Sequence, residues 1–317
     1  MGTREHEGYL RLADGCFLKR LEEPCVYNAP RDDLYELSEE ALEFLSLCDG
    51  TRTWSELRAE EDFLSYCREE GLLEITEEPS PREIRLGVNE SPSLRYLMVE
   101  VTDRCNLRCR HCYLGDAGSS DLDYDLLTEV LDAFDDMGGL RLMITGGEPL
   151  LYPRFPSLNH SLAGRSFRPV LITNGTLLGE EEIRGLNFME IQFSVDGLEE
   201  GHDYLRGRGT FSRVMASMRA ALDAGIDVSV ATVMHRRNLA ELEGLGELLS
   251  GLGVSSWTLE FPVPSGRMAE HRELVPGVEE SLPYFDLEWG SGPHEGAEGY
   301  ACGAHLAAVD TGGRLIK

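Results

Sequence analysis

Three cysteines, Cys105, Cys109 and Cys112, are spaced C-x3-C-x2-C in one short stretch of the chain. A [4Fe–4S] cluster normally takes four cysteine thiolates, one for each iron. Three thiolates on one loop can hold three irons and leave the fourth iron open to a ligand that is not protein. The apolar run from Tyr96 to Val101 predicts a buried strand that ends just before this loop. The spacing therefore predicts an open iron–sulfur cluster at a strand end.

Other uses of these cysteines stay open on spacing alone. A zinc knuckle needs a fourth nitrogen or sulfur donor, and none follows nearby, since His111 lies inside the motif itself. A thioredoxin-like pair of Cys109 and Cys112 would leave Cys105 without a role. Plain buried thiols are the remaining alternative. The open cluster is favoured because it uses all three thiolates and needs no fourth protein ligand.

Further motifs follow the cysteines, each where an apolar run ends. In Gly146-Gly147-Glu148-Pro149, the glycines allow backbone N–H groups to approach a ligand closely, and the carboxylate can accept from an ammonium group. Taken singly, such motifs are ordinary turns or solvated side chains. The motifs that follow the GGEP motif along the chain contain Asn174, Ser194, Asp196 and Arg206.

In this order the motifs resemble those of the radical S-adenosylmethionine (radical SAM) superfamily. The resemblance implies that Cys105, Cys109 and Cys112 hold a [4Fe–4S] cluster and that S-adenosylmethionine (SAM) chelates the open iron. It places the methionine amino group at the GGEP motif, the ribose hydroxyls at Ser194 and Asp196, and the SAM carboxylate at Arg206. The full set of cofactor-binding residues expected from it is His111, Gly146, Gly147, Glu148, Pro149, Asn174, Ser194, Asp196 and Arg206.

The resemblance also implies the reaction. An electron donor such as ferredoxin or flavodoxin would supply one electron, the sulfonium C–S bond of SAM would break, and the resulting 5′-deoxyadenosyl radical would remove hydrogen from a substrate. We name no protein acid or base as catalytic, because the cofactor carries the difficult chemistry.

The composition of the chain limits which cellular compartment and which binding partners are expected. The chain has 317 residues, enough for about two domains, and no apolar run approaches the length of a membrane span. The charged start is no signal peptide, and eight cysteines with three clustered as ligands favour a reducing cytoplasm, at low oxygen. The formal net charge is −28, so we expect neither a nucleic-acid nor a membrane partner.

Residues 1–78 are expected to form a small winged-helix-like α+β domain. A hairpin is predicted around Ala13-Asp14-Gly15, followed by a third strand near 34–37. Ser38 is expected to cap a helix, Thr53 and Glu56 to form a capping box, and a last helix to stop at Gly71 before a short strand. The sequence of this part resembles the PqqD-like peptide-recognition domain of ribosomal-peptide maturases.

A winged helix more often binds DNA, so that alternative has to be weighed. Residues 1–78 contain 8 basic and 21 acidic residues, a net charge of −13, and such a face cannot approach phosphates. Peptide binding by addition of a strand needs only an exposed sheet edge. The other reading is a domain that merely packs on its neighbour.

The rest of the chain is expected to be α/β. Residues 79–93 are a proline-punctuated linker, and residues 94–270 alternate strands with amphipathic helices. Six such units, in the resembled family, form a partial (β/α)6 barrel with its chemistry at the C-terminal strand ends. The strands are predicted near 96–102, 140–145, 169–173, 189–195, 226–233 and 255–261.

Residues 271–317 are expected to begin a C-terminal auxiliary-cluster (SPASM) domain. Pro264-Ser-Gly-Arg267 closes the sixth strand as it does in maturases with that domain, and Cys302 is followed by an apolar stretch and Asp310-Thr-Gly. Cys302 is thus a candidate ligand of an auxiliary [4Fe–4S] cluster, or else a lone thiol. The chain stops before a second such cysteine, so we expect a fragment of a longer protein or a truncated homologue.

The substrate expected is a peptide or protein side chain, such as a precursor peptide, modified in post-translational maturation. The alternatives are side-chain decarboxylation of a tetrapyrrole in haem-type biosynthesis, sulfatase maturation, and a non-catalytic peptide-binding paralogue.

Overall fold

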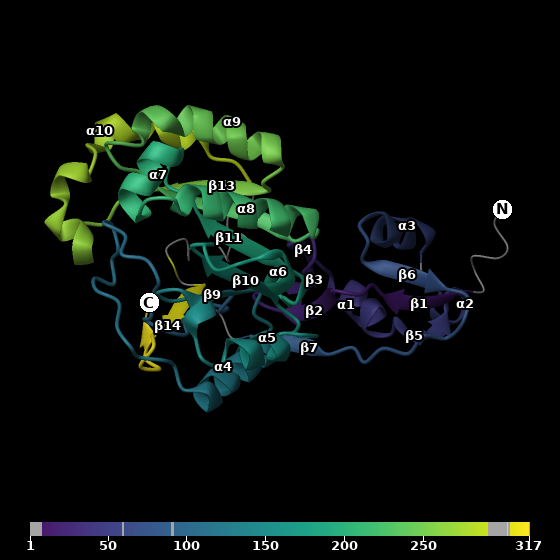
Figure 1. Cartoon of the computed structure of the whole chain (residues 1–317). Helices are drawn as coiled ribbons and strands as arrows, with labels where there is room; N and C mark the ends of the chain where they lie inside the picture. The colour runs from purple at the N-terminus through teal and green to yellow at the C-terminus, as the bar shows by residue number, and fades with distance from the viewer. Residues whose placement is uncertain (1–7, 59, 90–91, 291–302, 304, 317) are drawn as a thin grey trace.

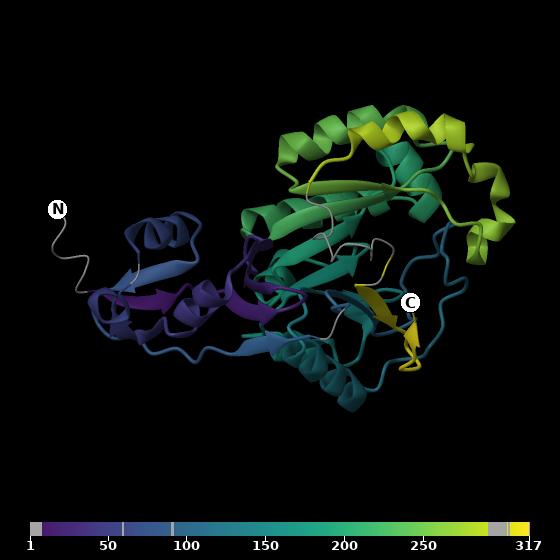
Figure 2. The same cartoon turned by 180° about the vertical axis from the view of Figure 1, so that it is seen from behind.

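The computed structural model describes residues 8–58, 60–89, 92–290, 303 and 305–316. Its main element is a twisted sheet in which six parallel strands lie side by side in sequence order, with helices on the outer face (Figures 1 and 2). This confirms the predicted α/β barrel and the position of each predicted strand. The strands are β8 (Tyr96–Glu100), β9 (Arg141–Thr145), β10 (Arg168–Thr173), β11 (Glu190–Ser194), β12 (Asp227–Val233) and β13 (Ser256–Glu260).

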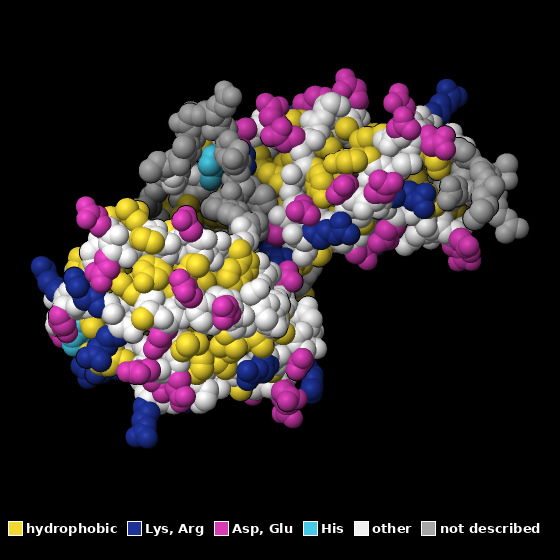
Figure 3. Space-filling model, turned by 90° about the horizontal axis from the view of Figure 1, so that it is seen from above, with side chains coloured by type: hydrophobic (Ala, Val, Ile, Leu, Met, Phe, Trp, Pro, Cys, Tyr) yellow, Lys and Arg dark blue, Asp and Glu magenta, His cyan; other side chains and the backbone are white. Residues whose placement is uncertain are grey.

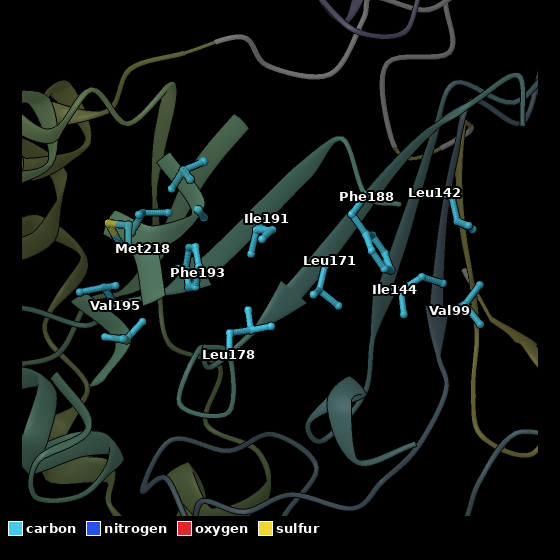
Figure 4. Packing of buried hydrophobic residues seen from close by; sticks show 14 of the residues in the cluster. Val99, Leu142, Ile144, Leu171, Leu178, Phe188, Ile191, Phe193, Val195 and Met218 are labelled. Carbon is cyan, nitrogen blue, oxygen red and sulfur yellow. The ribbon is translucent and has the colours of Figure 1, made fainter. Parts of the chain in front are cut away.

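Alternation along the strands divides the two faces of this sheet. Leu142, Ile144, Leu171, Ile191 and Phe193 are fully buried in the core between the sheet and the helices (Figure 4). The intervening side chains of the strands face the inside of the partial barrel, where they line a cavity. The helices that cover the outer face are α4 (Tyr124–Asp136), α5 (Phe155–Ser161), α6 (Glu180–Arg184), α7 (Glu199–Arg206), α8 (Thr210–Asp223) and α9 (Leu242–Leu252).

Two strands from the C-terminal region extend the barrel sheet. β14 (Leu306–Val309) pairs in parallel with β8, and β15 (Leu315–Ile316) pairs antiparallel with β14. The backbone N–H groups of Arg95 and Tyr96 both donate to the carbonyl of His305, at 2.9 Å, which fixes the start of β14. Part of the expected C-terminal extension therefore belongs to the barrel sheet, whereas Cys302 lies outside the described residues. Between β13 and β14 the chain forms η4 (Gly266–Glu270), η5 (Arg272–Leu274), α10 (Val278–Ser281) and η6 (Leu282–Leu287).

The N-terminal region contains a three-stranded antiparallel sheet and three short helices around their own apolar core. Ser38 accepts from the N–H of Ala41, Thr53 and Glu56 form a capping box, and Gly71 has a φ of +68°, all as predicted. The elements are β1 (Tyr9–Leu12), β5 (Asp49–Thr53), β6 (Leu73–Thr76), α1 (Glu39–Ser46), α2 (Trp54–Leu57) and α3 (Glu61–Glu69).

The predicted hairpin around residues 13–15 is wrong. β1 is paired on both edges, with β5 and with β6, so it has no free edge for the following strand. Gly15, with a φ of +80°, turns the chain into a second sheet instead, and its carbonyl accepts from the N–H of Ala29 at 3.0 Å. This second sheet has the order β4 (Asp33–Glu36), β3 (Pro24–Asn28), β2 (Cys16–Arg20) and β7 (Leu86–Val88), so the expected linker also supplies a strand.

The second sheet packs against the N-terminal ends of the barrel strands through buried polar groups. The guanidinium of Arg168 donates to the carbonyls of Ala29 and Pro30, at 2.8 and 2.9 Å, and Asp32 pairs with Arg141. Nζ of the fully buried Lys19 donates to the carbonyl of Gly139 at 2.8 Å. These contacts hold the N-terminal region at the end of the barrel opposite the C-terminal strand ends. Within the described ranges, no helix combines the length and the apolar character that crossing a bilayer requires.

The buried Lys19 predicts a pH-dependent stability. Burial lowers its pKa to about 7, against about 10.4 in an unfolded chain. Between these two pH values the unfolded chain binds more protons, so Lys19 makes the folded state more stable as pH rises from about 7 to about 10.4. We expect the stability of Lys19→Met, relative to wild type, to fall across this window in urea unfolding. Arg20→Met, which removes an exposed ion pair with Glu39, is the control, and its stability should change with pH as that of wild type does. The prediction is wrong if the stability of Lys19→Met also changes in parallel with that of wild type.

Candidate functional site

A cavity of about 370 Å³ lies at the C-terminal ends of the barrel strands, inside the partial barrel. The cysteine loop forms one wall, and inward-facing strand residues form the floor. The predicted site residues that line it are Cys105, Cys109, His111, Cys112, Gly146, Gly147, Asn174, Ser194 and Arg206. The structure thus brings together nine residues from five separate stretches of the sequence.

The three cysteines are free thiols, with Cys109 buried and Cys105 and Cys112 half-buried. In the part of the chain that the structure describes, no three His, Cys, Asp or Glu side chains converge on one point where a single metal ion could bind. Thiolates that bind three different irons of a cluster do not need to converge in this way. The donor set therefore fits a cubane cluster with one open iron better than a zinc ion.

The glycine pair holds the cysteine loop in place. The N–H of Gly147 donates to the carbonyl of Thr102, and the N–H of Glu148 donates to the carbonyl of Arg104, both at 2.7 Å. A Cβ on Gly146 would lie 2.2 Å from the Thr102 oxygen, and one on Gly147 would lie 2.3 Å from the Arg104 oxygen. The N–H groups of Gly147 and Glu148 thus donate to the loop, and contact of the GGEP motif with a ligand stays a prediction.

Glu148 and Pro149 are buried and do not line the cavity. The Glu148 carboxylate accepts from the hydroxyl of Thr173 at 2.8 Å and from the N–H of Asn174 at 3.0 Å, so it ties the end of β9 to the end of β10. Burial raises the pKa of Glu148 to about 7. Pro149 begins the short helix η2 (Pro149–Leu151). The predicted contact of the Glu148 side chain with a ligand ammonium group stays a prediction.

Asp196 is fully buried and is not part of the cavity lining, and its predicted contact with the ribose hydroxyls stays a prediction. Its carboxylate accepts from Nε of Arg206 and from the N–H of Val233, the latter at 2.8 Å. Burial is the largest single influence and would raise the pKa of Asp196, but the charge of Arg206, the smaller contributions of His111 and His202 and the hydrogen bond from Arg206 together lower it, so the carboxylate stays ionised. Asp196 therefore orients Arg206, whose Nη2 lies 3.4 Å from Nε2 of His111.

His111 and Asn174 complete the wall beside the cysteines. Burial lowers the pKa of His111 to about 4, so its ring is neutral near pH 7, and its buried Nδ1 has no hydrogen-bond partner among the described residues. The side-chain amide of Asn174 donates to Oδ1 of Asn106 at 3.0 Å, which connects the end of β10 to the cysteine loop.

Sequence reasoning missed several residues that face the cavity. Strand alternation could have found Gln192 and Glu260, since each shares the inward face of its strand with a smaller polar residue. Arg267 could have been found only from its place in the Pro264–Arg267 motif. Its Nε donates to the carbonyl of Cys109 at 2.8 Å, and its backbone N–H donates to the carbonyl of Cys112 at 2.9 Å. The motif thus clamps the cysteine loop from the side of β13.

Removal of this clamp should loosen the cluster. Replacing the buried Arg267 by methionine leaves the carbonyl of Cys109 without its charged donor, at a cost of about 1–3 kcal/mol to the closed loop. We expect iron to pass from the anaerobically reconstituted variant to a chelator about tenfold faster than from wild type. Arg108→Met is the matched control, because Arg108 lies on the same loop but pairs with Asp116 at the exposed surface. Equal rates of iron transfer to the chelator for the two variants would contradict the proposed role of Arg267 in holding the loop.

Comparisons with known proteins agree with this geometry. Residues 99–249 match the family model of the radical SAM superfamily. The AdoMet-dependent heme synthase of Oleidesulfovibrio alaskensis is 31% identical over 209 residues, which are 63% of this chain and 53% of the relative. The subtilosin biosynthesis protein AlbA of Bacillus subtilis is 26% identical over 278 residues, 80% of this chain and 62% of AlbA. The chain thus spans about half to three fifths of the length of these relatives.

The fold is similar to that of a solved structure over nearly the whole chain. SuiB of Streptococcus suis, in a crystal structure with its precursor peptide SuiA, matches with a TM-score of 0.67 at 15% identity. The match covers 97% of this chain and 82% of SuiB, so the N-terminal region and the barrel are both included. At this identity the likeness shows the shared fold.

Proposed function

We propose that the chain is a radical SAM enzyme that uses a [4Fe–4S] cluster and SAM to modify a peptide or protein side chain in post-translational maturation. The observation that carries the proposal is the cavity that collects the three cysteine thiols and six further residues predicted to bind the cofactors.

The residues present suit the cofactors that the family implies. Cys105, Cys109 and Cys112 would hold three irons of the cluster. Arg206, oriented by Asp196, presents a cation at the cavity wall for the SAM carboxylate, and Ser194 offers a hydroxyl near the same wall. When bound, the cluster and SAM supply the one-electron cleavage that gives methionine and a 5′-deoxyadenosyl radical. The chain contributes position and exclusion of water, since the loop that carries the cysteines is fixed by the glycine pair and by Arg267.

The N-terminal region supports a peptide as the substrate. AlbA, named for the biosynthesis of a bacteriocin, matches 80% of this chain, and SuiB, whose structure contains a precursor peptide, shares the fold of 97% of it. One edge of the three-stranded sheet is covered, because Ser80 and Arg82 donate backbone hydrogen bonds to β5. β4 is the outer strand of the second sheet and is partly exposed, so a peptide strand could add there.

The first test is chemical. The reconstituted protein, given SAM and dithionite without oxygen, should release 5′-deoxyadenosine and methionine. With synthetic peptides from short reading frames beside the gene, a modified product should appear by mass spectrometry. Failure to cleave SAM would overturn the proposal as a whole.

The second test addresses the sheet edge. The N–H of Leu37 donates inward to the carbonyl of Pro24, so by strand alternation the N–H of Glu36 points outward. Glu36→Pro removes this outward donor and is tolerated at an edge. We expect Glu36→Pro to abolish binding of the peptide that is identified as the substrate in the first test, whereas Glu36→Ala should still bind this peptide. Equal peptide binding by both variants would mean that the β4 edge of the second N-terminal sheet does not bind the peptide.

A tetrapyrrole is the second candidate substrate. It is favoured by the heme synthases of Oleidesulfovibrio alaskensis and Methanosarcina barkeri, at 31% and 32% identity, although these match only 63% and 61% of the chain. Incubation with an iron coproporphyrin and SAM should then release carbon dioxide from the propionate side chains. That outcome, with no peptide modified, would replace the first proposal.

A further inference from the structure

Arginines gather around the cysteine loop in a chain with a net charge of −28. Four segments supply them: the cysteine loop, the turn after α7, the turn after β12 and helix η5. We name this surface the arginine face, and it consists of Arg108, Arg110, Arg208, Arg236, Arg237 and Arg272.

The four segments form one continuous surface around Tyr204. The guanidinium carbons of Arg110 and Arg237 lie 4.0 and 4.1 Å from the centroid of its ring. Nη1 of Arg110 also donates to the Tyr204 carbonyl at 2.7 Å. Beneath them Leu205, Met268 and Leu274 form a small buried cluster of their own. The stacking and the shared core fix the positions of two cations beside the loop, the half-buried Arg110 and the exposed Arg237.

The face has more positive than negative charge. Arg108 pairs with Asp116, and Arg236 pairs with Glu280 at 3.5 Å. Arg208, Arg237 and Arg272 are exposed and form no ion pair in the ranges that the structure describes. In Figure 3, several Lys and Arg side chains lie at the left end of the face in view, and others lie along the rest of it among Asp and Glu side chains. The six arginines of the arginine face outnumber the two carboxylates that pair with them, and two of these arginines, Arg108 and Arg110, lie on the cysteine loop itself.

The face is also adjacent to the ligands of the cluster. Arg110 stands between Cys109 and Cys112 in the sequence, and its N–H donates to the carbonyl of Leu205 at 2.9 Å. A protein docked on Arg110 and Arg237 would thus lie directly against the loop that carries the thiolates. A surface beside a redox centre, with cations on an otherwise acidic chain, fits an acidic partner that exchanges electrons.

We propose that the arginine face is the docking surface for an acidic, low-potential electron-carrier protein of the flavodoxin or ferredoxin class. The proposal rests on the radical SAM function above. The reduced carrier loses one electron, which passes through the cluster to the sulfonium of SAM. The C–S bond then breaks, giving methionine and the 5′-deoxyadenosyl radical. The acidic remainder of the chain repels such a carrier, so complementary charge confines docking to this face.

The test compares two double charge reversals in the full, reconstituted chain. Arg237→Glu with Arg272→Glu alters the face. Arg184→Glu with Arg219→Glu is the control, because it changes net charge equally on exposed positions of α6 and α8. Binding of a recombinant oxidised flavodoxin is measured by calorimetry. The rate of 5′-deoxyadenosine release is measured with reduced flavodoxin and with reduced methyl viologen, a small carrier that needs no docking surface.

We expect the face variant to bind flavodoxin about tenfold more weakly at low salt, and the ratio of flavodoxin-driven to viologen-driven release to fall by a similar factor. Both differences should shrink in 0.5 M salt, where the Debye length is about 4 Å. Unchanged binding by the face variant, an equal loss in the control, or binding of duplex DNA in place of flavodoxin would overturn the proposal. No release even with methyl viologen would instead reject the proposed function, while the binding measurement would still decide the docking surface.

Discussion

Replacing Cys105, Cys109 and Cys112 together by alanine is expected to abolish iron binding. The wild-type chain should take up about four irons on anaerobic reconstitution and absorb near 400 nm, as expected for a cysteine-ligated cluster. The structure places the three free thiols on one wall of a single cavity. The variant should have no absorbance in that region and no more iron than a chain without a cluster site. Iron is measured by chelation after acid release, beside the absorbance spectrum.

A matched control separates ligation from the general effect of losing a thiol. Cys67 is fully buried in the apolar core of the N-terminal region, where burial raises its pKa to about 11 and keeps it protonated. Cys67→Ala should bind iron like wild type. The assignment fails if the triple variant keeps its iron, or if the control loses as much. Far-ultraviolet circular dichroism of the apo forms checks that both variants fold.

The sequence predicted the barrel well for a physical reason. Four of the barrel strands, β8 to β11, are mainly apolar runs that end at a predicted motif, and parallel strands covered on both faces leave such runs in the sequence. Because all the C-terminal strand ends meet on one side, the motifs after β8, β9, β10 and β11 were bound to lie together, as the cavity shows. The cysteine loop and Arg206 are the clearest examples.

The sequence could not show which polar groups face the cavity and which face one another. Glu148 and Asp196 are carboxylates at strand ends, a pattern that suits a ligand contact as well as a structural link. Only the positions of Thr173 and Arg206 decide that both carboxylates are used inside the protein. The strand β3 was missed for a different reason: it begins with Pro24 and is buried throughout, so it has neither alternation nor a typical start.

The largest expected loss of stability comes from Arg168, at the junction between the second N-terminal sheet and the barrel. Its guanidinium is 3% exposed and pairs with Glu190 at 3.1 Å and with Asp227 at 2.5 Å. It also donates to the carbonyls of Ala29 and Pro30. Arg168→Met would leave Glu190 as a buried charge without its cation, at a cost of about 3–5 kcal/mol. Urea unfolding of the apo protein measures this loss.

The control and a rescue variant decide whether the buried charge is the cause. Arg184→Met removes an exposed ion pair with Glu180, which is worth at most about 0.5 kcal/mol. Adding Glu190→Gln to Arg168→Met should recover part of the loss, because the glutamine is neutral and can still accept from the hydroxyl of Ser229, now 2.6 Å from Glu190. A loss below about 1 kcal/mol for Arg168→Met would mean that this side chain contributes little to the junction. A full loss with no recovery in the double variant would mean that the lost carbonyl contacts, and not the buried charge of Glu190, are the cause. In the first case the sheet proposed to bind peptide would be held by the other contacts of the junction, such as the Asp32–Arg141 pair and the buried Lys19.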